Sequence, residues 1–319
     1  MNSIPTIFNE RLINRTVLGG KRNPEKSRMN VSVLLLNSGG IHLRSQNLEN
    51  LQKCGFKNII SMEKNSSSYN LEDLANKFPT VKFIIPQEEV TDGDLINIGM
   101  SETDADYVFV LRDSVQISNF VLSSNIAQKL IEKNCFCYVP RMTLDKLMVV
   151  DVDYIPFVEK GVFKVTSTST VVDGRQTLYP TAFIGLYNRQ KFIQLGGYDY
   201  TIKSPYWQNL DLSLRSWLWG EKTIVTTGIT LSFIESAPVE DTTSNLSQFR
   251  FYLKNLAPVF NLDHGELSKS AFFRTLRRTS CGFVETVRQF KDAREWVEKN
   301  KYRFKMDAAG LITSWGTEK

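Results

Sequence analysis

Histidine, cysteine and long apolar runs are scarce in this chain of 319 residues, and each scarcity argues against one kind of site or protein. Two histidines and four cysteines make a zinc site unexpected, and so few cysteines favour reduced thiols in a cytosolic protein. No stretch of about 18 uncharged apolar residues occurs, so the sequence predicts no membrane span. The N-terminal residues include Glu10 and lack a long apolar segment, which argues against a secretory signal. We therefore expect a cytoplasmic protein.

The excess of positive charge is small, at +5, but it is unevenly placed. Residues 249–303 are rich in Arg, Lys and aromatic side chains, which fits peripheral contact with a membrane or an acidic partner, or simply a solvated helical face. We expect this region to pack on the main domain or to form a homo-oligomer, because its apolar stripes are too large to remain exposed. These stripes contain Phe272, Phe273, Leu276, Phe283, Val284, Val287 and Phe290. Nothing in the sequence predicts a nucleic-acid partner.

Buried apolar runs and helical spacings alternate from residue 31 to about residue 140. This alternation predicts an α/β fold with a mixed, mostly parallel sheet flanked by helices. We divide the chain into an N-terminal arm (1–30), a main domain (31–244) and a helical C-terminal extension (245–319). The expected strands are residues 31–36, 56–62, 81–85 and 107–111, followed after a less regular stretch by AFIGLY, TIVTT and ITLSFI.

Four stretches, in this order, carry a resemblance to family 2 glycosyltransferases, which have the GT-A fold. They are VSVLLLNS, IISMEKNSSS, GDLINIGMSETDADYVFVLRDSV and AFIGLYNRQKFIQLGGYDYTIKSPYWQNLDLSLRSWLWG. The resemblance covers residues 30 to 235 approximately, and the last stretch is the most specific. It implies a nucleotide-sugar donor pocket beyond the first, second and fourth strands, where open parallel sheets bind their ligands. The implied donor-binding residues are Asn37, Ser38, Glu63, Asn97, Arg112, Asp113 and Ser114.

The triplet at the end of the fourth strand departs from the family pattern. The family places a DxD motif there, and two carboxylates at that spacing can bind Mg²⁺ or Mn²⁺. Here the triplet is Arg112-Asp113-Ser114, so Asp113 is the single remaining candidate ligand and a metal cofactor is disfavoured. Asp113 is equally well interpreted as a turn residue. Arg112 could itself face the leaving diphosphate in place of a cation.

The acceptor half departs from the family pattern in a similar way. The acidic pair expected at the acceptor becomes Gln208-Asn209, and a side-chain amide cannot take a proton near neutral pH. Asp211 remains, either as a catalytic carboxylate or in a local ion pair with Arg215. Tyr206 and Trp207 precede this pair and have the aromatic faces that stack on sugars.

A second DxD occurs later, at Asp151-Val152-Asp153. The spacing suits a metal site in isolation, but the motif comes after the wrong strand. We interpret it as an edge strand with both carboxylates in solvent.

Two functions remain open from the sequence. The first is a glycosyltransferase that moves a hexose-type sugar from a nucleoside diphosphate to a glycan, lipid or protein acceptor, with the inversion typical of the family. The second is a degenerate GT-A domain that binds a nucleotide, a glycan or a protein without catalysis. The missing carboxylates are what keep the second interpretation open.

Overall fold

The structure is a computed structural model that describes residues 4–21, 27–38, 44–64, 71–118, 121–144, 148–276 and 282–316. Of the four cysteines, Cys54 and Cys137 are buried, Cys135 is half-buried, and Cys281 lies outside the described residues. None of the described helices combines the length and the apolar character needed to cross a bilayer.

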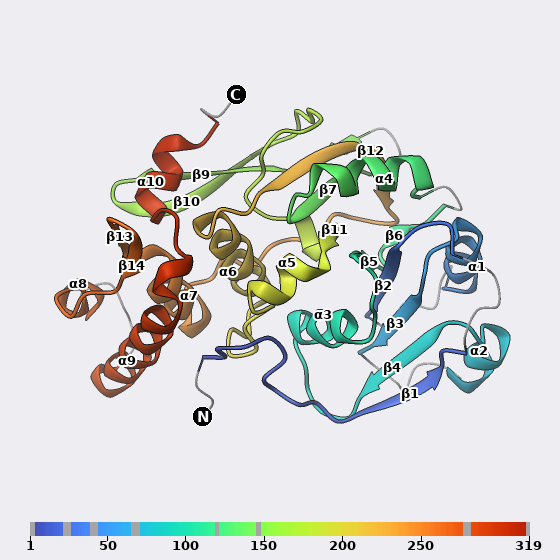
Figure 1. Cartoon of the computed structure of the whole chain (residues 1–319), viewed down its shortest axis with the longest axis horizontal. Helices are drawn as coiled ribbons and strands as arrows, with labels where there is room; N and C mark the ends of the chain where they lie inside the picture. Colours follow the sequence, from blue (N-terminus) through green and yellow to red (C-terminus); the bar gives the residue numbers. More distant parts are fainter. Residues whose placement is uncertain are drawn as a thin grey trace.

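A mixed ten-stranded sheet forms the centre of the molecule (Figure 1). Strands β2, β3, β4, β5, β7 and β12 run in one direction, so the sheet is mostly parallel, as the sequence predicts. In spatial order its strands are β1 (Arg15–Gly19), β4 (Lys82–Pro86), β3 (Ile59–Glu63), β2 (Val31–Asn37), β5 (Tyr107–Arg112), β11 (Gly185–Asn188), β7 (Cys137–Leu144), β12 (Thr223–Phe233) and β6 (Val115–Gln116), with β8 (Met148–Val150) paired to β7.

Helices cover the sheet because the central strands are apolar on both faces. All seven residues of β2 and all five of β3 are buried, as expected for strands between two helical layers. Helix α3 begins with a capping box in which Thr91 and Asp94 bond each other's backbone amides. The helices of this part are α1 (Arg44–Cys54), α2 (Leu71–Lys77), α3 (Asp92–Ser101), α4 (Ser124–Lys133), α5 (Arg189–Gln194) and α6 (Pro205–Leu218).

The predicted N-terminal arm contains a strand that the sequence analysis missed. β1 pairs antiparallel with β4 and forms one edge of the sheet. At an edge only part of the strand is covered, so its residues lack the clear periodicity of a core element. Gly19 ends the strand at φ 69°, and a Cβ there would lie 2.3 Å from the carbonyl oxygen of Val81. The turn therefore requires glycine at this position.

The two predicted closing strands are one long strand, β12, with a break in its register against β7 between Thr226 and Thr230. The irregular middle of the chain forms a separate hairpin of β9 (Asp153–Glu159) and β10 (Val162–Thr168). Asp153 corrects the solvent-facing interpretation of the second DxD, because its side chain is 1% exposed and pairs with Arg175 at 3.0 Å.

The C-terminal part packs against α6, on the side away from β1 to β4 (Figure 1). A second apolar core combines α6 residues such as Leu210 and Leu214 with C-terminal residues such as Phe251 and Trp296. The proposed boundary at residue 244 therefore falls within a shared core. The elements are α7 (Leu246–Phe251), the π-helix η3 (Tyr252–Leu256), β13 (Val259–Asn261), β14 (His264–Glu266), α8 (Ala271–Leu276), α9 (Phe283–Asn300), the 3₁₀ turn η4 (Lys301–Arg303) and α10 (Ala308–Ser314).

Candidate functional site

The strand order reverses between β2 and β5, and open α/β sheets generally bind ligands beyond the carboxyl ends of their strands at such a point. Asn37 ends β2, and the next backbone amide, that of Ser38, donates to Asp113 Oδ2 at 2.7 Å. The backbone amide of Asp113 in turn donates to the carbonyl of Leu36 at 3.1 Å. Asp113 therefore lies in the turn after β5 and holds the end of β2 against it.

Glu63 lies at the carboxyl end of β3, directly beside Asn37 on β2. Its carboxylate forms a buried ion pair with Arg44 and accepts hydrogen bonds from Ser61 Oγ at 2.7 Å and Asn37 Nδ2 at 3.3 Å. Burial raises the pKa of Glu63, although Arg44 and Ser61 oppose that shift. Strands β3 and β5 are two strand spacings apart, or about 10 Å. The structure thus brings Asn37, Ser38, Glu63 and Asp113 to one edge, as the sequence predicts.

Asn37 presents an acceptor atom that is not satisfied by the described residues. Its Nδ2 donates to Ser61 Oγ at 2.6 Å, whereas its buried Oδ1 accepts no hydrogen bond within the described part of the chain. A buried acceptor without a donor costs about 1–3 kcal/mol. A ligand that supplies an N–H or O–H group at this point would remove that cost.

Arg112 ends β5 within a cluster of charges that sequence reasoning did not find. Its guanidinium forms an ion pair with Asp92 and donates through Nε to the carbonyl of Ala182 at 2.8 Å. Asp92 also pairs with Lys64 at 3.1 Å. Burial pushes the pKa of Asp92 upward, but Arg112 and Lys64 outweigh burial and hold the pKa below its usual range. Lys64, directly after β3, and Arg112, at the end of β5, thus both pair with the carboxylate of Asp92.

The residues at the degenerate triplet do not fit a divalent cation. Mg²⁺ and Mn²⁺ prefer about six oxygen ligands. Asp113 uses one carboxylate oxygen for the Ser38 amide, Ser114 supplies only a hydroxyl, and Arg112 is a cation. Across the described ranges there is no group of three Asp, Glu, His or Cys side chains that could hold a metal.

The whole fold resembles a solved structure of GalNAc-T7 with UDP, GalNAc and Mn²⁺. The TM-score is 0.57 at 13% sequence identity, and the match covers 90% of this chain and 58% of that one. The chain has the GT-A fold. At this identity the likeness concerns the fold alone, and the chain spans less than two thirds of its neighbour. No protein-family model and no curated protein matches the sequence.

Three residues predicted to bind substrate have structural roles inside this GT-A domain. Asn97 exchanges two hydrogen bonds with the backbone of Tyr198, at 2.8 and 2.9 Å, and so ties α3 to the acceptor half. The fully buried Gln208 accepts from the Gly93 amide at 3.1 Å. Trp207 is 6% exposed and donates to the carbonyl of Thr243 at 3.0 Å. Helical spacing does not show which face another helix covers, so these contacts could not be predicted from the sequence, and binding of substrate by the three side chains stays a prediction.

Asn209 is buried on α6, where its Nδ2 donates to the carbonyl of Pro180 at 2.7 Å. Its Oδ1 is buried and accepts no hydrogen bond from the described residues. Pro180 begins a short bridge between the two halves of the site, because Ala182, two residues later, accepts from Arg112. The amide of Asn209 therefore positions the segment that also holds Arg112.

Asp211 faces away from Asn209, into the second core. It is fully buried, with Lys254 Nζ at 2.9 Å, Arg215 at 3.3 Å and Asn255 Nδ2 at 2.8 Å. Lys254 also binds Asp199 at 2.8 Å. Burial opposes ionisation of Asp199, but Lys254 holds its pKa below the ordinary value. These contacts favour a structural role for Asp211 and leave it out of reach of an acceptor.

A carboxylate that sequence reasoning missed lies beside the acceptor half. Glu240, in the loop after β12, accepts a hydrogen bond from the Tyr179 hydroxyl at 2.6 Å. The Tyr179 ring stacks on Tyr154 at 4.2 Å and meets Tyr206 edge-on at 6.0 Å. Tyr206, the predicted sugar platform, is therefore half-buried in this cluster. The sequence offers little signal for Glu240, because it lies in a loop without periodicity.

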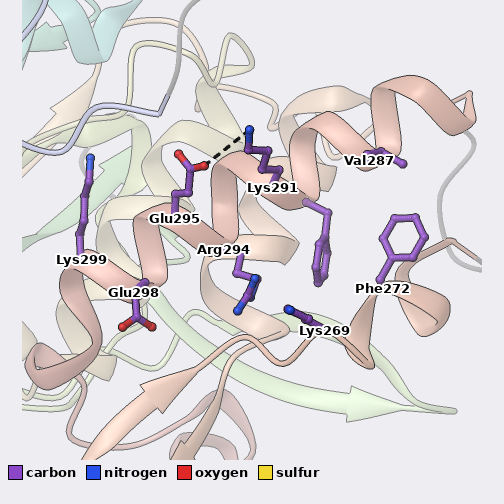
Figure 2. A pocket seen from close by; sticks show the side chains of 9 residues that line it. Lys269, Phe272, Val287, Lys291, Arg294, Glu295, Glu298 and Lys299 are labelled. Atoms are coloured by element: carbon purple, nitrogen blue, oxygen red, sulfur yellow. Dashed lines mark ion pairs between the residues drawn. The ribbon is translucent and has the colours of Figure 1, made fainter.

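The hollow of about 720 Å³ in the C-terminal helices is not the donor site. Figure 2 shows its lining side chains on α9, on α8, which carries Phe272, and on the segment leading into α8, which carries Lys269, far along the chain from β2 and β5. Its charges have both signs, and Lys291 pairs with Glu295 at 3.9 Å. Phe273 and Phe283 are largely exposed nearby. Contact of these helices with a membrane or a second copy stays a prediction.

We predict that Asn209→Asp lowers the free energy of unfolding by about 1–3 kcal/mol instead of simply restoring a base. The new carboxylate would lose the bond to Pro180 and face its carbonyl oxygen in a buried position. Its pKa in the folded state would rise above the unfolded value, so the variant should be less destabilised at pH 4 than at pH 8. Urea denaturation at both pH values measures this. Unchanged stability together with faster sugar transfer would show instead a latent base position.

Proposed function

We propose that this chain binds a nucleoside-diphosphate sugar at the carboxyl ends of β2, β3 and β5 and transfers the sugar to a glycan, lipid or protein acceptor. The observation that carries the proposal is the convergence of Asn37, Ser38, Glu63 and Asp113 at the switch point of a GT-A fold. The structural neighbour GalNAc-T7 was solved with UDP and GalNAc, which makes a uridine diphosphate sugar the first donor to test.

We assign to Arg112 and Lys64 the role of offsetting the negative charge of the leaving diphosphate. Both cations form ion pairs with Asp92, and Arg112 is oriented by its hydrogen bond to the carbonyl of Ala182. A diphosphate carries more charge than one carboxylate and can take over both cations at the same edge. The unsatisfied Oδ1 of Asn37 would accept from an N–H of the nucleotide base.

The expected result is UDP binding that does not require a divalent cation. Calorimetric titration of UDP into the protein with EDTA, and again with Mn²⁺, should give dissociation constants within about threefold, because guanidinium and ammonium groups supply the positive charge. A dissociation constant that falls by tenfold or more with Mn²⁺ would contradict the metal-independent proposal. Absence of UDP binding and of turnover with any nucleotide sugar would contradict the proposed function itself.

A degenerate binding domain is the second candidate. The side chains of α6 favour the binding domain, because the amide of Asn209 cannot accept a proton and the carboxylate of Asp211 is buried in an ion pair with Lys254. The distinguishing assay is hydrolysis of UDP-N-acetylgalactosamine, UDP-N-acetylglucosamine and GDP-mannose at high enzyme concentration. Binding of UDP without any hydrolysis or transfer would favour the binding domain over the enzyme.

A further inference from the structure

The loop of residues 234–245 joins the donor edge to the acceptor helix. At its start, the amide of Ile234 donates to the carbonyl of Ser114, in the degenerate triplet, at 2.9 Å. Near its end, the carbonyl of Thr243 accepts from Trp207, in the first turn of α6, at 3.0 Å. The two ends of this loop therefore contact the donor edge and the acceptor helix.

Glu240 is the acidic side chain of this loop that turns inward. Its neighbours Val239 and Asp241 are exposed, whereas Glu240 is half-buried against the tyrosine cluster. Its Oε2 accepts from Tyr179, and its Oε1 accepts no hydrogen bond from the described residues. In the described part of the chain no Lys or Arg forms an ion pair with Glu240. The titratable groups that face it are Tyr154, Tyr179 and Tyr206.

The backbone next to Tyr179 connects this carboxylate to the donor residues. Pro180 accepts from Asn209 and Ala182 accepts from Arg112. Tyr154 stacks on Tyr179, and its hydroxyl lies 3.1 Å from Thr181 Oγ1. Residues 179–182 thus bond in turn to Glu240, to the acceptor helix and to Arg112. Glu240 is therefore linked through this short segment to both the acceptor helix and Arg112.

We propose that Glu240 is the general base that accepts the proton of the acceptor hydroxyl, and this rests on the proposed sugar transfer. Oε1 takes the proton while the acceptor oxygen forms a bond to the anomeric carbon. The bond from that carbon to the diphosphate oxygen breaks, and its electron pair leaves with the diphosphate toward Arg112 and Lys64. Tyr179 is a positioning residue that holds the other carboxylate oxygen.

Burial sets the pH range in which this base can act. It raises the pKa of Glu240, and the hydrogen bond from Tyr179 only partly opposes that rise. The base must be ionised, so activity should increase with pH through this raised pKa. Tyr179→Phe removes the opposing hydrogen bond and should move the acidic limb of the kcat profile to higher pH.

The test compares Glu240→Gln with wild type in hydrolysis of UDP-N-acetylgalactosamine, where water is the acceptor. The expected result is a fall in kcat of about 100-fold or more with UDP affinity unchanged, the effect of losing a positioned base. Glu235→Gln, an exposed residue of the same loop, is the matched control and should retain wild-type kcat.

Three results would overturn the assignment of Glu240. The first is a kcat of Glu240→Gln within about twofold of wild type, and the second is an effect confined to KM or to UDP binding. The third is a Tyr179→Phe variant whose kcat profile has its acidic limb at the same pH as wild type. This measurement tests the assignment even if Glu240→Gln fails to fold. Failure of the proposed function is separate, because wild type would then bind no UDP and hydrolyse no donor.

Discussion

Replacing Lys254 with Met is expected to lower the free energy of unfolding by about 3–5 kcal/mol, the typical cost of removing one partner of a buried ion pair. The Lys254 side chain is fully buried between Asp199 and Asp211. It also lies 4.8 Å from the centre of the Trp296 ring. Without it, both carboxylates would remain in the second core, and among the described residues the further ion pair is the one between Arg215 and Asp211, at 3.3 Å.

The free energy of unfolding that is lost in Lys254→Met should depend on pH in a defined direction. In the wild type, the lowered pKa of Asp199 contributes stability above about pH 4, and this stability disappears as the pH falls through the lowered value. In the variant Asp199 would lose Lys254 while its burial, which raises the pKa, would remain, so protonation of Asp199 by acid would relieve its repulsion with Asp211. The difference in unfolding free energy should therefore be largest near neutral pH and smaller at pH 4.

Lys164→Met is the matched control for Lys254→Met. Lys164 pairs with Glu159 on the β9–β10 hairpin, and both side chains are about half exposed. Exposed ion pairs contribute about 0–1 kcal/mol, so this variant should differ little from wild type in urea denaturation. A Lys254→Met protein within about 1 kcal/mol of wild type would show that the buried network does not hold the C-terminal part to α6.

Arg112→Ala is expected to weaken UDP binding by about 10- to 100-fold. A hydrogen bond to a charged group is worth about 1.5–3 kcal/mol, and each 1.4 kcal/mol changes a dissociation constant tenfold. Arg112 is 15% exposed at the side chain, so a ligand can reach it without unfolding of the sheet. Arg112→Lys should fall between alanine and wild type, because it keeps the charge but loses the planar fork.

Arg175→Ala provides the control for charge removal alone. Arg175 also pairs with a buried carboxylate, that of Asp153, and its backbone bonds Val225 near the amino end of β12, away from the donor edge. UDP affinity should stay within about twofold of wild type in this variant. Equal affinities for UDP in Arg112→Ala and wild type would contradict the assignment of the diphosphate to Arg112.

Much of the fold was predictable because a strand that is buried on both faces has a continuous apolar sequence. The runs that form β2, β3 and β5 are apolar on both faces, and the breaks after Asn37 and Arg112 mark the carboxyl ends of β2 and β5. The edge strand β1 was not predictable by the same signal, because it is only partly covered. Packing of the C-terminal part on the main domain was expected, but Phe273, Phe283 and Val284 of the stripes named for it are largely exposed, and the shared core uses other residues such as Phe251 and Trp296. The π-helix that places Lys254 was not predicted.

The site was predictable only where chain order determines position. Asn37 and Glu63 end, and Ser38 and Asp113 directly follow, neighbouring parallel strands of one mixed sheet, so their convergence follows from topology. The roles of side chains on α3 and α6 depend on which helix covers which face, and a single sequence does not give that. Partners such as Asp92, or a loop residue such as Glu240, come from remote segments without a periodic pattern.

The central claim is that a nucleoside diphosphate binds at the β2–β5 switch point with Arg112 in place of a metal. The most direct test is a crystal structure of the wild-type protein soaked with UDP and Mn²⁺. We predict the diphosphate within hydrogen-bond distance of the Arg112 guanidinium, the base near Asn37, and no Mn²⁺ on Asp113. UDP bound elsewhere on the molecule, or a Mn²⁺ ion coordinated by Asp113 and bridging to the diphosphate, would contradict the claim.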